Sequence, residues 1–189
     1  MSQRQDILKR RKAVGNIRTV TRTMQFIASS RLAQAQRLAQ SSQSYTRGLA
    51  ETVGSLIARN GEALEHALLS PGPADAPVLL IVLSSNRGLC GGFNNNVAAR
   101  AKRRREQLIE SGQEVHLCTI GRKVSAAFRR EGIIPDADYD TFDSLPARPV
   151  VRRLMDRFLV GFAEGHYSAI EIVYPQFASA GQQHPVIAP

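Results

Sequence analysis

Proline is absent from the first 70 residues of this 189-residue chain, whereas nine prolines follow that point. Glycine is scarce there too, since positions 4–59 contain only Gly15, Gly48 and Gly54. These residue types break helices most strongly, and the stretch is otherwise rich in the helix formers Ala, Leu, Arg and Gln. The sequence therefore predicts one long helix over residues 1–59. At about 1.5 Å per residue it would be roughly 80 Å long, so it must project from any domain that follows.

Acidic residues are nearly missing from this predicted helix. It holds eleven Lys and Arg residues against only Asp6 and Glu51, an excess equal to the net charge of +9 of the whole chain. The rest of the chain is therefore balanced, and the positive field belongs to the helix.

The predicted helix also carries an apolar stripe. Counted in heptads from Ile7, ten of sixteen a and d positions are apolar, which is modestly more than the 43% hydrophobic composition would give by chance. A helix this long cannot bury its own stripe, so a second long helix must lie against it, either from another chain or from a further part of this protein. The ten positions are Ile7, Val14, Ile17, Met24, Ala28, Ala35, Leu38, Tyr45, Leu49 and Leu56.

Long apolar runs and closely spaced cysteines are also lacking. The longest apolar runs, such as residues 78–83, are far shorter than the roughly 20 residues that span a bilayer, and no signal peptide precedes the basic amino terminus. We therefore expect a soluble, cytoplasmic chain. Cys90 and Cys118 lack the spacing of a metal site, which favours reduced thiols and leaves a disulfide or redox role as the alternative.

Behind the helix, the sequence predicts a linker over residues 60–76, an α/β globular domain over 77–175 and an extended tail over 176–189. Strands and helices alternate within the domain, which indicates a small three-layer α/β fold with a mainly parallel sheet. The expected strands are 77–85, 114–120 and 169–174, the expected helices are 94–111, 121–130 and 149–164, and residues 133–145 are expected to be acidic and irregular.

A glycine-rich segment, residues 84–93 (SSNRGLCGGF), separates the first expected strand from its helix. Backbone N–H groups in such a turn can bind an anion, which would suit a small nucleotide-binding enzyme. However, the glycine spacing matches neither the dinucleotide fingerprint nor the phosphate loop. We therefore favour a structural interpretation, in which the glycines allow a tight turn between the strand and the helix. The residues of this turn are Arg87, Gly88, Leu89, Cys90, Gly91 and Gly92.

Other candidate sites are weak. The four histidines are scattered, and Asp136, Asp138 and Asp140 lack the glycine and glutamate that complete a calcium loop. No serine or cysteine has the neighbours of a catalytic nucleophile. We therefore expect no catalytic residues, no metal and no cofactor. A basic zipper that binds nucleic acid remains an alternative use of the cationic helix.

Two separated segments resemble the gamma subunit of the rotary F-type ATP synthase. Residues 14–32 (VGNIRTVTRTMQFIASSRL) are similar to the amino-terminal shaft helix of that family, and residues 84–94 (SSNRGLCGGFN) match its glycine signature almost residue for residue. Residues 174–179 and 183–185 also resemble the end of the family's globular domain. In the family a second long helix follows that domain, whereas this chain stops at Pro189.

The resemblance implies a non-catalytic central stalk of a proton-translocating ATP synthase, coupling ion flow to ATP synthesis or hydrolysis. The implied partners are the alpha and beta subunits, the epsilon subunit, the membrane rotor ring and the second long helix, with no nucleic acid. The implied location is peripheral, on the cytoplasmic face of the bacterial inner membrane. The shaft residues expected to contact the catalytic subunits are Arg18, Arg22, Met24, Ile27 and Arg31.

Overall fold

The computed structural model describes residues 2–60, 66–140, 148–179 and 181–189. The chain divides into two units, Met1–Leu64 and Glu65–Pro189, each with its own internal contacts.

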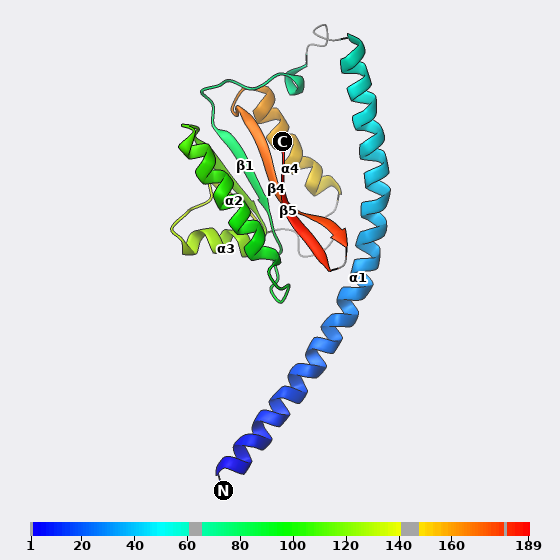
Figure 1. Ribbon diagram of the computed structural model, residues 1–189, viewed down its shortest axis with the longest axis vertical. Coiled ribbons are helices and arrows are strands. Elements are labelled where there is room, and N and C mark those ends of the chain that lie inside the picture. The colour runs from blue at the N-terminus through cyan, green and yellow to red at the C-terminus, as the bar shows by residue number, and fades with distance from the viewer. Residues whose placement is uncertain (1, 61–65, 141–147, 180) are drawn as a thin grey trace. The chain divides into compact units, whose positions relative to one another are not determined.

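The first unit is a single helix, α1 (Ser2–Asn60), and the prediction of one unbroken helix is confirmed. Figure 1 shows it as a continuous, gently curved ribbon. The three helix glycines have open space around them, so none marks a close contact. The hydroxyls of Thr19, Thr21 and Thr23 each donate to the carbonyl four residues earlier, which satisfies these side chains within the helix.

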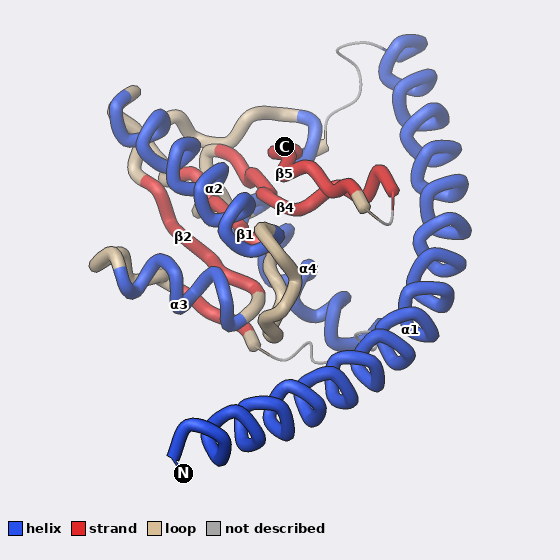
Figure 2. The backbone as a smooth tube through the Cα atoms, turned by 60° about the horizontal axis from the view of Figure 1, so that its bottom comes forward, coloured by secondary structure: helices blue, strands red, loops and turns tan. Residues whose placement is uncertain are grey.

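The second unit is built on a five-stranded sheet in the order β3-β2-β1-β4-β5 (Figure 2). Strand β1 (Val78–Leu83) lies at the centre and pairs in parallel with β2 (Val115–Ile120) and β4 (Ala169–Ser179). Strand β3 (Ala137–Tyr139) is parallel to β2, and β5 (Gln182–Ala188) is antiparallel to β4. The mainly parallel sheet agrees with the predicted fold class.

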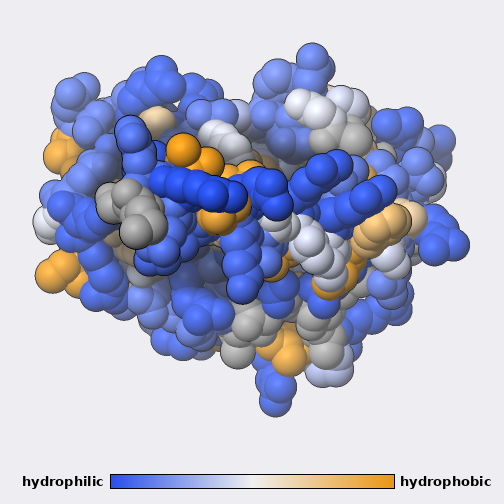
Figure 3. Space-filling view, turned by 90° about the horizontal axis from the view of Figure 1, so that it is seen from below, coloured by the Kyte–Doolittle hydropathy of each residue, from blue (hydrophilic) through white to orange (hydrophobic). Residues whose placement is uncertain are grey.

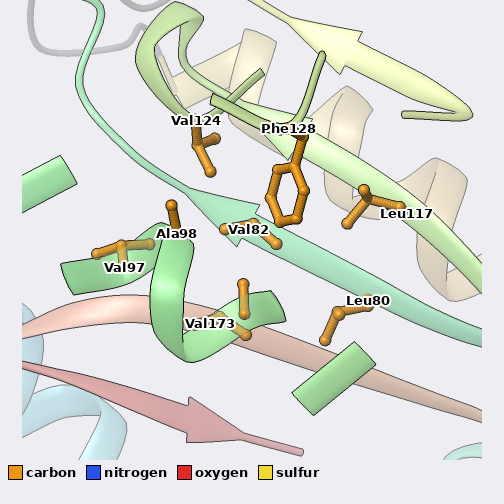
Figure 4. Packing of buried hydrophobic residues seen from close by; sticks show 9 residues of the cluster. Leu80, Val82, Val97, Ala98, Leu117, Val124, Phe128 and Val173 are labelled. Atoms are coloured by element: carbon orange, nitrogen blue, oxygen red, sulfur yellow. The ribbon is translucent and has the colours of Figure 1, made fainter. Parts of the chain in front are cut away.

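Helices cover both faces of this sheet. On one face, α2 (Phe93–Glu110) and α3 (Arg122–Arg130) pack over Leu80 and Val82 (Figure 4). On the other face, α4 (Arg148–Ala163) packs Phe158 against the alternate residues of β1. Because β1 is buried from both sides, its residues are apolar without a break, as the sequence indicated.

The acidic segment after α3 is more ordered than expected. Residues 133–145 are expected from the sequence to be irregular, but residues 137–139 form β3, and residues 141–145 lie outside the described part of the chain. The Asp136 carboxylate accepts a hydrogen bond from the Leu117 N–H at 2.7 Å, and Asp138 accepts one from Arg129 at 2.7 Å. These carboxylates therefore fasten the segment to β2 and α3.

The carboxyl-terminal residues also differ from the expected extended tail. Strand β4 continues to Ser179, and β5 returns beside it as an antiparallel hairpin. Only residues 169–173 of β4 pair with β1, so beyond Val173 the hairpin forms a two-stranded ribbon that extends the sheet.

The expected linker is partly docked on the domain. Residues 66–77 include a short 3₁₀ turn, η2 (Ala67–Leu69), and the Gly72 N–H donates to the Ser168 carbonyl at 3.1 Å. The Ser168 N–H in turn donates to the Pro77 carbonyl at 3.0 Å. A Cβ atom at position 72 would lie 2.1 Å from the Tyr167 carbonyl oxygen, so this close approach requires glycine.

Candidate functional site

The large apolar side chains of α1 lie mostly along one side of the helix. Successive residues are about 100° apart around a helix axis, and by that spacing thirteen of the fifteen exposed large apolar residues of α1 fall within a sector of roughly 160°. Met24 is 43% exposed, and the residues at both ends of the stripe, Ile7 and Leu56, are exposed as well. The stripe is therefore an accessible apolar surface that runs along the whole helix.

The cations of α1 lie mainly on the opposite side. By the same spacing, eight of the eleven fall within a sector of roughly 140° that excludes the apolar stripe. α1 thus has an apolar side and a cationic side. The eight are Arg4, Arg11, Lys12, Arg18, Arg22, Arg37, Arg47 and Arg59.

The helix separates the five shaft residues that the sequence analysis selected. Arg18 and Arg22 lie on the cationic side, whereas Met24, Ile27 and Arg31 lie on the apolar side. A partner that covers one side of the helix cannot contact all five. Recognising this separation needs only the helical period, which the sequence already contains.

The glycine-rich turn between β1 and α2 is held by side chains at both of its ends. The Ser85 N–H and hydroxyl both donate to Oδ1 of Asn94, at 3.1 and 2.9 Å. The Asn94 amide in turn donates to Sγ of Cys90 at 3.0 Å. Gly91 has a φ of 59°, in the left-handed region where glycine is favoured, and Leu89 adopts a φ of 62° at the same turn.

The same turn is fastened to the beginning of α3. The Ser84 hydroxyl accepts a hydrogen bond from the Val124 N–H at 3.1 Å, and Asn86 Oδ1 accepts one from the Arg122 N–H at 2.9 Å. A Cβ atom at Gly121 would lie 2.4 Å from the Ser84 carbonyl oxygen. The turn after β1 and the turn before α3 are therefore in direct contact. This bracing supports the structural interpretation of the turn. The sequence alone did not predict this bracing by Ser84, Asn86 and Asn94, although each is a polar residue at the end of a buried strand or the start of a helix.

The two cysteines have different environments. Both are free thiols; Cys90 is exposed, and Cys118 is buried in β2. Burial is the main reason that the pKa of Cys118 is raised to about 12. Its thiol is therefore protonated at neutral pH, so it has little nucleophilic character.

Charged contacts within the domain are structural. Arg104 of α2 forms a two-pronged pair with Glu171 of β4, and this hydrogen bonding raises the pKa of Arg104. The hydrogen bonds from Arg129 and then from Ser125 lower the pKa of Asp138. Both pairs join a helix to a strand.

Two of the clefts on the described part of the domain differ in polarity. An apolar cleft of about 330 Å³ lies between α4 and the sheet and is lined by residues such as Leu154 and Ile172. A more polar cleft of about 470 Å³ lies between the start of α2 and the β4–β5 hairpin and includes Asn96 and His184. Among the residues that the structure describes, no three His, Cys, Asp or Glu side chains gather as a metal site would require.

The surface seen in Figure 3 is mainly hydrophilic, and hydrophobic side chains appear on it only as small, separate groups. In the described ranges, no helix combines the length and apolarity needed to cross a bilayer.

Comparison with known proteins gives a consistent set of relatives. A family model described as ATP synthase matches residues 3–189. The chain is 32% identical over 179 residues to the ATP synthase gamma chain of Rhodopirellula baltica, covering 95% of this chain and 60% of that one. It is also 32% identical over 188 residues to the gamma chain of a Synechococcus species, covering 98% of this chain and 59% of the relative. The chain therefore spans about three fifths of the length of these relatives.

Among solved structures, the chain is similar to a chain of the central stalk and c-ring of the Tetrahymena thermophila mitochondrial ATP synthase. The similarity has a TM-score of 0.51 at 19% identity and covers 70% of this chain and 57% of that chain. At this identity, the likeness supports the fold.

Proposed function

Because this chain belongs to the ATP synthase gamma-chain family, we propose that it serves as the central rotor stalk of a rotary ATP synthase. In this role it would couple ion flow through the membrane sector to ATP synthesis or hydrolysis in the catalytic subunits, and it would perform no bond chemistry itself. The observation that carries the proposal is α1, a 59-residue helix whose apolar side is exposed along its length. No feature of the comparisons supports the nucleic-acid alternative.

The apolar side of α1 suits a second long helix. Its stripe drifts by about 20° per heptad around the helix, as a seven-residue repeat does on a straight helix of 3.6 residues per turn. A partner helix that follows the stripe would wind around α1 with a left-handed supercoil. Two helices in contact resist bending better than one, and a stalk that transmits torque needs such stiffness.

The cationic side suits the surrounding subunits. Charge attraction is long-range and weakly directional, so it allows a shaft to turn, whereas interdigitated apolar contact would hold one angle. We therefore assign Arg18 and Arg22 to contact with acidic surfaces of the alpha and beta subunits. Met24, Ile27 and Arg31 lie on the apolar side. There they would contact the second helix and the neighbouring part of the ring formed by the alpha and beta subunits.

The coupling mechanism follows from differential binding. Each rotor angle would bind one set of catalytic-site conformations better than the others, so rotation shifts each site in turn between states. The α/β domain would sit against the epsilon subunit and the rotor ring, peripheral to the bacterial inner membrane.

The experiment that tests the proposal is reconstitution with the alpha and beta subunits of the same organism. We expect the protein to co-purify with them in a single complex that hydrolyses ATP, and we expect no hydrolysis by the protein alone. Robust ATPase activity of the isolated polypeptide, or failure to assemble with these subunits, would contradict the proposal. Steep salt-dependent DNA binding with half-site specificity would favour the nucleic-acid alternative instead.

A further inference from the structure

The outward side of α4 combines cations with exposed apolar residues. Four arginines and one acidic residue, Asp156, occupy positions 148–157 of this helix. Leu159 and Val160 follow and are 39% and 53% exposed. By the helical period, Arg152, Arg153 and Val160 point away from the sheet, on the side opposite to the buried Phe158.

The arginines of this surface are weakly engaged. The side chain of Arg152 is 84% exposed and meets Asp156 only at 3.8 Å. Arg157 donates to the hydroxyl of Tyr139 at 3.2 Å. Within the described ranges, Arg148 and Arg153 have no ion pair.

The charge order of α4 opposes the stability of the helix itself. A helix carries partial positive charge at its amino end, which acidic residues stabilise and basic residues destabilise. The first turn of α4 contains no acidic residue, and Arg148, Arg152 and Arg153 all lie within its first six positions. The arginines and the helix dipole therefore add to one positive field at this end, which an anionic partner would stabilise.

We propose that the outward side of α4, formed by Arg148, Arg152, Arg153, Leu159 and Val160, is a docking surface for an acidic protein partner. Charge complementarity determines the chemistry of this partner. Carboxylates would face the arginine-rich amino half, and an apolar side chain would cover Leu159 and Val160. A charged rim beside a small apolar contact is the usual composition of a specific protein interface. The inference goes beyond the stalk function and does not depend on it, because it concerns only the surface of the α/β domain.

Photo-crosslinking in cells of the source organism tests this proposal. The natural protein is produced with p-benzoylphenylalanine in place of Val160, irradiated, and purified with any adduct. We expect an adduct to one protein, through a peptide in which Asp and Glu outnumber Lys and Arg. We expect the double variant Arg152→Glu/Arg153→Glu to reduce the adduct yield by roughly tenfold or more, because like charges then face each other across the contact.

Two controls match this test. The variant Arg100→Glu/Arg103→Glu changes the charge of the chain by the same amount on exposed residues of α2, across the sheet, and should leave the yield at position 160 unchanged. The neutral variant Arg152→Gln/Arg153→Gln should give an intermediate yield, which separates loss of attraction from unfolding.

Four outcomes would overturn the proposal. These are no adduct at position 160, an adduct to phospholipid, an adduct peptide without acidic excess, and an adduct whose yield does not respond to the reversal of Arg152 and Arg153. A phospholipid adduct would place this surface on a membrane. None of these outcomes bears on whether the protein assembles with the alpha and beta subunits, so failure here is distinguishable from failure of the stalk function.

Discussion

Pro175 and Pro185 lie directly opposite each other in the β4–β5 hairpin. Neither residue has an N–H group, so the pair cannot occupy a hydrogen-bonded position of the antiparallel ladder. In the alternate position, the backbone of each proline faces the outer edge of its own strand. Both edges of the hairpin therefore lack a donor at the same level, which hinders the addition of a further strand.

Replacing Pro185 by threonine should increase self-association. The change supplies an N–H group on the free edge of β5 and favours an extended backbone, and each new strand-to-strand hydrogen bond contributes about 1 kcal/mol. Light scattering at matched concentrations should show a larger mass for Pro185→Thr than for the unmodified protein. The control Gln183→Thr has the same new side chain but adds no N–H group, so equal behaviour of the two variants would refute the edge explanation.

Gly72→Ala should destabilise the α/β domain. A Cβ atom at this position would lie 2.1 Å from the Tyr167 carbonyl oxygen, so the segment 66–77 must move away and lose its hydrogen bond to Ser168. Strain of this kind typically lowers the free energy of unfolding by about 1–3 kcal/mol. Urea denaturation followed by tyrosine fluorescence measures it, since Tyr139, Tyr167 and Tyr174 lie in the domain.

Gly181→Ala is the matched control for that measurement. No heavy atom lies within 4 Å of a Cβ built at Gly181, so we expect a change within about 0.5 kcal/mol. Equal stability of the two variants would show that residues 66–77 are not held against the domain as described.

The parts of the fold that the sequence predicted are those determined by local pattern. The absence of proline predicts α1, and the unbroken apolar run predicts β1 because a strand buried on both faces needs apolar residues at every position. Strand β3 was missed because it has three residues, among them Asp138, whose carboxylate is stabilised by Arg129 from another element. No local pattern contains that contact.

The difference between local pattern and contacts from distant elements also explains why the hairpin and part of the candidate site were not predicted. Strand β5 includes Gln182, Gln183 and Pro185, which have low strand propensity, and its conformation depends on pairing with β4. The glycine turn was predicted from its own residues, but its bracing by Ser84 and Asn86 depends on α3, which is 36 or more residues away in the chain. The two sides of α1 were in the sequence from the start, because they depend only on the helical period.

Cys90 and Cys118 should differ strongly in their reaction with iodoacetamide. The pKa of Cys118 is raised from 9.0 to about 12, so at neutral pH its thiolate fraction is about a thousandfold smaller than that of an unperturbed thiol. Because burial raises the pKa of Cys118, its thiolate forms only as the pH rises toward 12. Near neutral pH almost no Cys118 thiolate is present to react. Mass spectrometry after alkylation at pH 8 should find Cys90 modified and Cys118 unmodified, with both modified in urea. Alkylation of Cys118 in the folded protein at a rate similar to that of Cys90 would contradict its burial.

Met24→Lys should impair coupling in the assembled ATP synthase. Met24 lies on the apolar side of α1, where a lysine must either keep its charge in water, which displaces the neighbouring helix, or be buried at a high desolvation cost. Displacement of the shaft would weaken the link between rotor angle and catalytic-site conformation more than it would slow hydrolysis itself. We therefore expect ATP hydrolysis to continue while proton pumping per ATP falls, measured by fluorescence quenching in inverted membrane vesicles. Ser29→Lys adds the same charge on the cationic side of α1, where the proposed function places contact with acidic surfaces, and should change the ratio little. If pumping per ATP is unaltered in Met24→Lys, or falls equally in both variants, the two sides of α1 do not have the separate roles assigned to them.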